Sequence, residues 1–213
     1  MPVHDRSSFE NLYAGQPRWE IGRPQRAILD VADRITGSVL DAGCGTGENA
    51  LFFASRGQTV TGIDFLADPI TRAKRKTAER GLTATFLVRN ALALREWKDV
   101  FDSAIDSGLF HVFSDDDQRR YVEGLASALK PGGRLFLLCV SDAEPGDQGP
   151  RRVSRNELED TFAEGWVIES VEPSRYEVRP DPHDRSFREG GPKAWFAVVR
   201  STGAGVTTSN ENR

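Results

Sequence analysis

The chain has 213 residues, a formal net charge of −4 and a sequence pI near 5.5. This length suits one ordinary domain, and 38% hydrophobic with 28% charged residues is the composition of a globular protein with a full core. The acidic balance argues against generic nucleic-acid binding, and no segment approaches the roughly 20 apolar residues of a membrane span.

The two cysteines, Cys44 and Cys139, are too few for a disulfide framework and lack the spacing of metal ligands. The first residues, Met1–Arg6, carry no apolar segment of the kind found in secretory signals. We therefore expect a cytoplasmic protein with no metal site, no membrane contact and no nucleic-acid partner.

The leader, residues 1–21, is predicted to be irregular. Its aromatic side chains Phe9, Tyr13 and Trp19 indicate a segment that folds back over another part of the molecule, as a lid. At the other end, residues 201–213 are small and polar, which predicts a disordered tail. The remaining residues, 22–200, form the predicted main domain.

Helices and strands alternate along this domain. The apolar spacing and the positions of proline and glycine predict helices over residues 24–35, 49–56, 68–80, 115–129 and 154–163. Strands are predicted over residues 38–41, 59–63, 85–88, 101–105, 134–140, 166–178 and 195–200. The alternation indicates an α/β fold with a seven-stranded, mostly parallel sheet and helices on both faces, and the last two strands predict a closing antiparallel hairpin.

A glycine-rich turn, Asp41–Gly47, joins the first strand to a helix. Glycine is needed where the backbone reverses and a ligand comes close, although such turns also recruit glycine for geometry alone. Asp64 ends the next strand, where a carboxylate can accept hydrogen bonds from ribose hydroxyls; a helix N-cap is the alternative. The Gly-x-Gly-x-Gly spacing is not the pyrophosphate fingerprint, and Asp41 favours a cationic amine or sulfonium over a phosphate.

Three motifs in this order resemble those of the class I S-adenosylmethionine (SAM)-dependent methyltransferases. Val39–Gly47 is similar to their first motif, Thr61–Asp64 to their second, and Leu129–Leu135 to the signature before their fifth strand. The resemblance implies a Rossmann-like fold with strand order 3-2-1-4-5-7-6, SAM as cofactor and S-adenosylhomocysteine (SAH) as product. After strand three the family usually has an acid that holds the adenine amine. This chain has Asn90 there, whose side-chain carbonyl can accept the same hydrogen bond.

The segment Pro17–Gln25 resembles the entry segment of thiopurine- and tellurite-methyltransferase relatives, and especially of bacterial enzymes that methylate hydroxylated quinolones and other aromatic heterocycles. In those proteins the segment covers SAM and the acceptor pocket. The resemblance implies methyl transfer to an O, N or S nucleophile of a small aromatic or heterocyclic molecule, as in secondary metabolism. Phe9, Tyr13 and Trp19 would then stack on a flat substrate; simple packing of the leader is the alternative.

The fourth strand runs into Ala104–His111, which a sheet of this type places over the cofactor. No Asn/Asp-Pro-Pro-aromatic motif of the DNA amino-methyltransferases follows it, which favours a small acceptor. An acidic hydroxyl or thiol acceptor needs no base. For a less acidic acceptor, His111 is the candidate general base, and a structural histidine is the alternative.

The predicted site residues fall into two groups. The cofactor-binding group comprises Trp19, Asp41, Gly43, Cys44, Gly45, Gly47, Asp64, Phe65, Asn90, Ala91, Asp106 and Ser107. The substrate-binding group comprises Phe9, Tyr13, Phe110, His111 and Tyr176, with His111 also as the catalytic candidate.

Other functions share part of this pattern. An NAD(P)-dependent oxidoreductase of Rossmann type has the same opening strand–helix–strand unit, but the glycine spacing, Asp41 and the lack of a Tyr-x-x-x-Lys pair argue against it. A SAM-binding protein without catalysis and an enzyme that methylates proteins both stay open. The sequence predicts neither the acceptor's identity nor the oligomeric state.

Overall fold

A computed structural model of the chain describes residues 6–97, 100–146, 149–180 and 190–203. Its seven strands form one sheet in the order β3-β2-β1-β4-β5-β7-β6, which confirms the predicted order and fold class. Neighbours from β3 to β5 pair in parallel, and β7 pairs antiparallel with both β5 and β6. The strands are β1 (Val39–Ala42), β2 (Val60–Asp64), β3 (Thr85–Val88), β4 (Phe101–Ser107), β5 (Leu129–Val140), β6 (Trp166–Arg175) and β7 (Lys193–Ser201).

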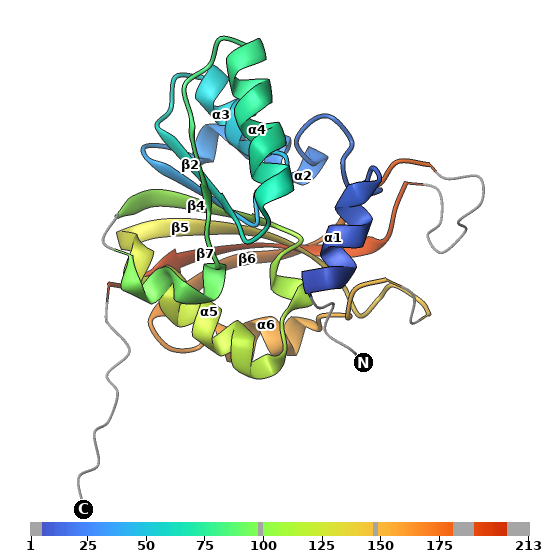
Figure 1. Cartoon of the computed structure of the whole chain (residues 1–213). Coiled ribbons are helices and arrows are strands. Elements are labelled where there is room, and N and C mark those ends of the chain that lie inside the picture. Colours follow the sequence, from blue (N-terminus) through green and yellow to red (C-terminus); the bar gives the residue numbers. More distant parts are fainter. Residues whose placement is uncertain (1–5, 98–99, 147–148, 181–189, 204–213) are drawn as a thin grey trace, which may run out of the picture.

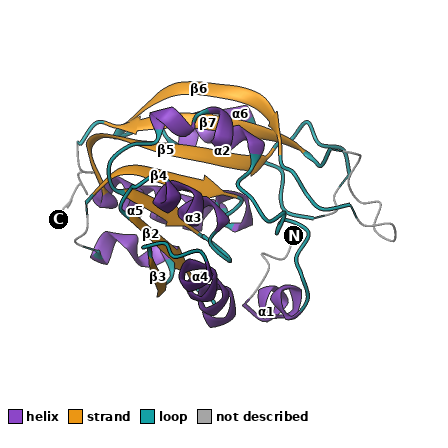
Figure 2. Cartoon of the chain, turned by 90° about the horizontal axis from the view of Figure 1, so that it is seen from above, coloured by secondary structure: helices purple, strands orange, loops and turns teal. Residues whose placement is uncertain are grey.

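Helices cover both faces of the sheet (Figure 1). One face carries α2 (Arg26–Asp30), α3 (Glu48–Ser55) and α4 (Ala67–Glu79), which lie above the sheet in Figure 1 and in front of it in Figure 2. The other face carries α5 (Asp115–Ala128), α6 (Arg155–Thr161) and the short 3-10 helix η2 (Ala91–Glu96). None of the helices within the described ranges is long and apolar enough to cross a lipid bilayer.

The pleat of the strands divides the hydrophobic core into two clusters. In β5, Phe136, Leu138 and Val140 pack towards α3, whereas the alternating Leu135 and Leu137 pack towards α5. All five side chains are buried, as expected for a strand covered on both faces. The continuous apolar character of β5 is therefore the sequence signal of a central strand between two helical layers.

The leader differs from its prediction as an irregular segment, which is wrong for residues 6–14. They form helix α1 (Arg6–Ala14), which lies beside the end of α4 in both views (Figures 1 and 2). Phe9, Leu12 and Tyr13 have the i, i+3, i+4 spacing of one helix face. A helix this short is marginal in isolation, and its fold depends on the surface beneath it.

Other boundaries also differ. The predicted helix over residues 24–35 breaks after α2, and a 3-10 turn, η1 (Ala32–Arg34), follows the non-helical Val31. The predicted strand over residues 166–178 ends at Arg175, three residues before its predicted limit. Ser201 belongs to β7 and is buried, while the rest of the predicted tail from residue 204 lies outside the described residues.

Candidate active site

A cavity of about 780 Å³ lies beyond the carboxyl ends of the parallel strands, between them and the leader. Its wall on the strand side consists of the segments that follow β1, β2, β3 and β4. Fourteen predicted site residues line the cavity: Phe9, Tyr13, Trp19, Gly43, Cys44, Gly45, Gly47, Asp64, Phe65, Asn90, Ala91, Ser107, His111 and Tyr176. The topology therefore brings together most of the residues that the sequence singles out.

The glycine turn after β1 requires its glycines. Gly43, Gly45 and Gly47 have φ of +67°, +52° and +85°, a region that side chains with a Cβ rarely adopt. Space is also short, because a Cβ on Gly45 would lie 2.7 Å from the Tyr13 hydroxyl oxygen. The turn thus presents bare backbone to the cavity immediately before α3 begins.

Asp64, at the end of β2, braces this turn. Its Oδ2 accepts a hydrogen bond from the Gly45 N–H at 3.1 Å, and its Oδ1 accepts one from the Leu66 N–H at 2.9 Å. Burial raises the pKa of the Asp64 carboxyl more than these hydrogen bonds lower it. The N-cap of α4 is Leu66, so Asp64 does not take the alternative N-cap role, and its carboxylate lines the cavity in a position suited to ligand hydroxyls.

The segment after β3 forms the adjoining part of the wall. Asn90 caps η2, since its Oδ1 accepts a hydrogen bond from the Leu92 N–H at 2.9 Å. A carbonyl oxygen has a second lone pair, so this contact leaves acceptor capacity on Asn90. Ala91 is buried beside it, and Phe65 meets Phe9 of the leader edge-to-face with ring centroids 5.7 Å apart.

Three predicted residues, Asp41, Asp106 and Phe110, are not among the described residues that line the cavity. The Asp41 Oδ2 accepts a hydrogen bond from the Ala50 N–H in α3 at 3.1 Å, and burial raises the pKa of Asp41 to about 7. The alternation of side chains along a strand explains why Asp41 points towards α3. Asp41 shares its face of β1 with Val39, which packs towards α3. The carboxylate therefore supports the first turn of α3 from behind the glycine turn.

Asp106 supports the segment that follows β4, as Asp41 supports the first turn of α3. Its Oδ1 accepts hydrogen bonds from the backbone N–H groups of Leu109, at 2.8 Å, and Phe110, at 3.2 Å. Burial raises the pKa of Asp106 to about 7, although these bonds oppose the shift. Phe110 itself is fully buried and stacks on Phe162 of the core, so it faces α6 rather than the cavity.

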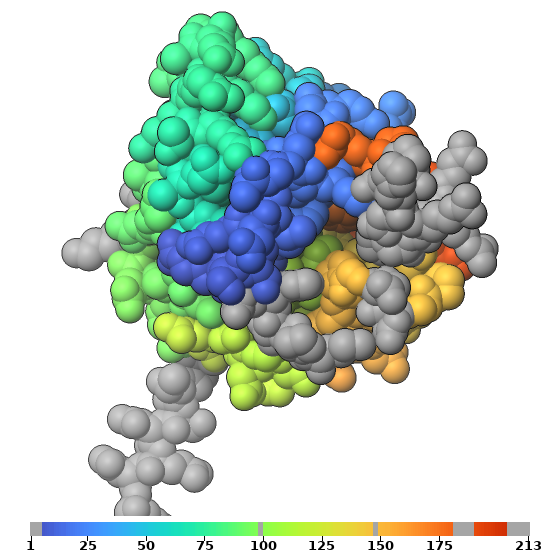
Figure 3. All heavy atoms as spheres, turned by 45° about the vertical axis from the view of Figure 1, so that its right-hand side comes forward, coloured from blue at the N-terminus to red at the C-terminus, as the bar shows by residue number. Residues whose placement is uncertain are grey.

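The leader closes the cavity opposite the strand ends. Figure 3 shows its described residues in dark blue, lying across the middle of one face of the molecule. Tyr13 is buried, its hydroxyl accepts a hydrogen bond from the Trp19 Nε1–H at 3.3 Å, and the two rings meet edge-to-face. Arg72 of α4 donates to the Tyr13 carbonyl at 2.6 Å, which ties α1 to the main domain.

The residues after the leader are fastened to the chain that follows β6. Arg23 makes a two-pronged ion pair with Glu177, at 2.9 and 2.7 Å. The Gln25 side chain donates to the Glu177 carbonyl and accepts from its N–H, and the Arg26 N–H donates to the Glu177 carboxylate. Glu177, just after β6, therefore anchors the residues that follow the leader.

His111 and Tyr176 form the end of the cavity near β5. His111 lies in the 3-10 helix η3 (Phe110–Val112), is 6% exposed, and accepts a hydrogen bond on Nδ1 from the Val140 N–H at 3.0 Å. Tyr176 meets the His111 ring edge-to-face, and its hydroxyl donates to the Ser107 carbonyl at 3.1 Å. The surrounding lining is mostly apolar: Leu109, Val112, Phe113, Val140, Pro150, Val178 and Pro192.

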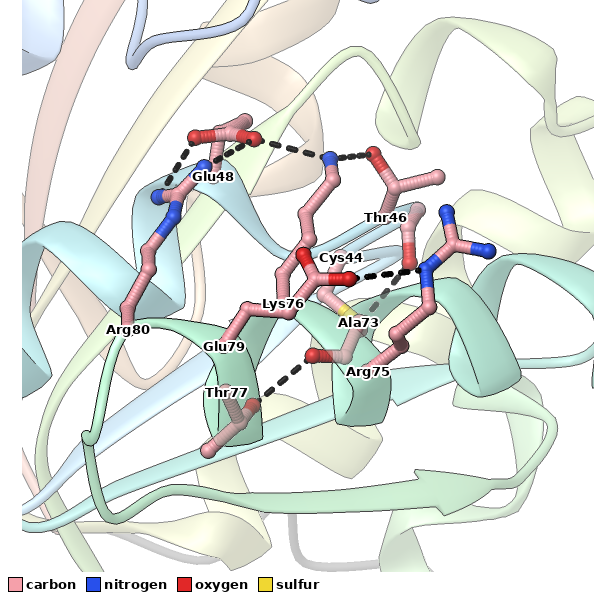
Figure 4. Close-up of polar contacts among 10 residues, drawn as sticks. Cys44, Thr46, Glu48, Ala73, Arg75, Lys76, Thr77, Glu79 and Arg80 are labelled. Carbon is pink, nitrogen blue, oxygen red and sulfur yellow. Dashed lines mark hydrogen bonds and ion pairs between the residues drawn. The ribbon is translucent and has the colours of Figure 1, made fainter.

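A polar group beside the cavity, drawn in Figure 4, was not among the predicted site residues. Lys76 reaches from α4 to Thr46 Oγ1 and Glu48 Oε1, each at 2.8 Å, and Arg80 pairs with both oxygens of Glu48. Thr46 and Glu48 line the cavity and directly flank Gly47. The position of Thr46 and Glu48 beside Gly47 could have identified them as site residues from the sequence. Their contacts with Lys76 could not be predicted in this way, because no local sequence pattern pairs these residues.

Glu20 of the leader was also missed. It lines the cavity, and its Oε1 is buried without a hydrogen-bond partner among the described residues. A buried carboxylate oxygen without a partner is costly, so this atom is suited to accept a hydrogen bond from a molecule bound in the cavity.

Comparison with known proteins agrees with this geometry. The family described as "Methyltransferase domain" matches residues 39–133. A 2-heptyl-1-hydroxyquinolin-4(1H)-one methyltransferase from Mycobacteroides abscessus is 34% identical over 210 residues, covering 92% of this chain and 90% of that protein.

Solved structures give the same result. A protein studied for the conversion of a disulfide bond into a thioacetal group during echinomycin biosynthesis has a TM-score of 0.81 and 35% identity, covering 94% of both chains. The 1,6-didemethyltoxoflavin-N1-methyltransferase of Burkholderia thailandensis, with SAH bound, has a TM-score of 0.72 over 92% of this chain and 87% of that one. At 24% identity, that second likeness supports the fold alone. The matches and the strand order agree, and the chain belongs to the class I SAM-dependent methyltransferases.

Proposed function

We propose that this methyltransferase acts on an O, N or S nucleophile of a small, flat, aromatic or heterocyclic molecule. The observation that carries the proposal is the mostly apolar lining of the cavity around His111 and Tyr176. A volume of about 780 Å³ is in the range of small-molecule sites. His111 and Tyr176 are buried, at 6% and 9% exposure, which disfavours a protein side chain as acceptor.

The cofactor fits the residues of the strand-side wall. In this proposal Asp64 accepts hydrogen bonds from the ribose hydroxyls, and the bare backbone of the glycine turn lies along the cofactor. Asn90, Ala91 and Phe65 surround the adenine, with Ser107 and Trp19 nearer the methionine part. The buried, unpartnered Oε1 of Glu20 suits the cofactor's ammonium group, a role that Asp41 cannot take directly from behind the turn.

The leader excludes water and orients the acceptor. Phe9, Tyr13 and Trp19 contact one another or Phe65 through edge-to-face rings, so they form a connected aromatic surface above the cavity. Such a surface favours flat apolar ligands. The relative named for hydroxyquinolone methylation supports a heterocyclic acceptor for this chain also.

When bound, SAM supplies a methyl group on a sulfonium: the acceptor's lone pair forms the new bond, and the electron pair of the broken carbon–sulfur bond stays on sulfur. The protein's part is to align the acceptor in line with that bond and to keep water away. Both tasks depend on a closed leader.

We also propose that the protein works in the reducing cytoplasm and takes part in secondary metabolism. Cys44 and Cys139 are both buried free thiols, and burial raises the pKa of each well above its usual value. Neither thiol is therefore a reactive nucleophile under ordinary conditions.

The test is turnover of SAM with a panel of hydroxylated quinolones, related N-heterocycles, phenols and thiols. We expect stoichiometric SAH and a methylated product by mass spectrometry for at least one flat heterocycle. Tight SAH binding without any product across the panel would instead favour a SAM-binding protein without methyl transfer. An NAD(P)-dependent oxidoreductase has no support from the family or from the relatives.

A further inference from the structure

Glu20 places a negative charge on the leader wall of the cavity. Its Oε1 is buried and has no hydrogen-bond partner within the described part of the chain. Three arginines also line the cavity, and each has another contact: Arg23 with Glu177, Arg18 with the Arg179 carbonyl, and Arg89 with the Trp97 ring. A buried carboxylate oxygen in this state destabilises the packing that buries it.

A second acid lies near the same point of the cavity. The Tyr13 hydroxyl is close to the glycine turn, since a Cβ on Gly45 would come within 2.7 Å of its oxygen. Burial raises the pKa of this hydroxyl, and the negative charges of Asp64 and Glu20 raise it further, while the hydrogen bond from Trp19 opposes the shift. The sheet and the leader thus each contribute an acid near Tyr13. Like charges on the two walls oppose the packing of one wall on the other.

The segment that carries Glu20 also carries the aromatic surface for the acceptor. Trp19 is its neighbour in the chain, and the Trp19 ring meets Phe9 and Tyr13 with centroids 6.4 and 5.9 Å apart. Helix α1 has nine residues, too few to be stable without the surface beneath it. A change in the free energy of leader packing therefore also changes the affinity for an acceptor that binds this surface.

We propose that Glu20 couples the two halves of the site: the ammonium group of the cofactor neutralises its carboxylate and so stabilises the leader wall that receives the acceptor. This inference rests on the proposed function and concerns the regulation of the same site. Glu20 is then a positioning residue for the acceptor, because it acts through the leader. The coupling is reciprocal, so a bound acceptor also strengthens cofactor binding, and the favoured order is cofactor first.

The first test uses the wild type alone and does not measure turnover. Hydrogen exchange of the α1 amides is followed without ligand, with saturating SAH, and with saturating SAH analogue in which hydrogen replaces the amino group. We expect SAH to slow this exchange about tenfold, and the analogue to leave it nearly unchanged. The analogue keeps the adenosine and the carboxylate, so only the ammonium group differs.

Two variants test the charge on the leader. Glu20→Gln keeps the shape and removes the charge, so its α1 should exchange as slowly without ligand as the wild type does with SAH. The wild type should prefer SAH to the analogue about tenfold by calorimetry, and Glu20→Gln should bind both equally. Glu10→Gln is the matched control, because it removes an acid from the same leader at a side chain that is 55% exposed and paired with Arg6. It should keep the SAH dependence and the preference of the wild type.

The acceptor arm measures the coupling itself. The affinity of the flat heterocycle that gives product in the turnover panel should be about tenfold higher with SAH than with the analogue. Equal protection of α1 by the two ligands, or a Glu20→Gln variant that stays as dependent on SAH as the wild type, would overturn the inference and leave methyl transfer intact. The expected exchange pattern without methylation of any acceptor would support the coupling and count against the proposed function.

Discussion

The two walls of the cavity are built in different ways. The strand-side wall consists of backbone turns at the ends of β1 and β2, held by strand pairing and by Asp64. The leader wall is attached through side chains such as Arg72 and Glu177, which lie far away in the sequence. The first wall is therefore continuous with the sheet, whereas the second is held by side-chain contacts, both polar and aromatic. In the proposed arrangement most cofactor contacts therefore come from the sheet, whereas the acceptor and the Trp19 and Glu20 contacts depend on the leader.

Removing the Asp64 carboxylate should give the largest effect on the strand-side wall. Asp64→Ala leaves the Gly45 and Leu66 N–H groups unpaired and removes the predicted ribose contact. We expect SAH affinity to fall about 100-fold, or ~2.7 kcal/mol, by isothermal calorimetry. Affinity within threefold of wild type would show that Asp64 braces the turn without touching the cofactor.

Crowding the glycine turn should have the next largest effect. Gly45→Ala adds a Cβ at φ +52° that would lie 2.7 Å from the Tyr13 hydroxyl oxygen. We expect about tenfold weaker SAH binding, ~1.4 kcal/mol. Gly57→Ala is the matched control, because Gly57 also has positive φ, +84°, but has nothing within 4 Å of its added Cβ. The control should lose stability of ~1 kcal/mol and keep its affinity; equal affinity losses would contradict the steric argument.

Loosening the leader should change acceptor binding more than cofactor binding. Arg72→Ala removes the hydrogen bond to the Tyr13 carbonyl together with an i,i+4 pair to Asp68. We expect the acceptor KM to rise about threefold to fivefold, ~0.6–1 kcal/mol, with a smaller change in SAH affinity. Arg75→Ala removes a comparable surface pair to Glu79 on the same helix and should leave both constants unchanged. Equal behaviour of the two variants would mean that the leader is not held through Arg72.

The smallest effect should come from a site remote from both walls. Lys130 and the Ser38 N–H lower the pKa of Asp102 to about 2, from an ordinary 3.8. Because this folded-state pKa is depressed, the contact stabilises the fold above about pH 4 and is lost as the pH falls towards 2. Asp102→Asn should lower the free energy of unfolding at pH 7 by less than ~1 kcal/mol, since the ion pair is solvent-exposed. Urea titrations should show the difference shrinking below pH 4, with SAH affinity unchanged; a difference that grows in acid contradicts the assignment.

The strand-side wall was predictable because its signals are local. Positive φ at Gly43 and Gly45 demands glycine, and an acid at the end of β2 follows a recognisable strand. The direction of Asp41 was also open to prediction from the pleat, since Leu40 and Ala42 face α5 and the residue between them must face α3. Sequence motifs alone do not distinguish an acid in the cavity from one behind it.

The helical form of the leader and the partner of His111 could not be predicted from the sequence. Helix α1 forms on a surface supplied by α4 and Phe65, so its own nine residues carry too little information. The Nδ1 contact to Val140 joins two segments that pair only through the tertiary fold. Sequence motifs can indicate a histidine at the site, but they cannot indicate which backbone group its Nδ1 contacts.

The attachment at Glu177 has an evolutionary consequence. It lies just beyond β6, on the antiparallel edge of the sheet, while the glycine turn belongs to the parallel part. Changes in the connection between β6 and β7 should therefore alter the leader and the range of accepted substrates more than the contacts of the glycine turn. Directed evolution of acceptor preference should consequently gain most from libraries around Arg23, Gln25 and residues 176–180.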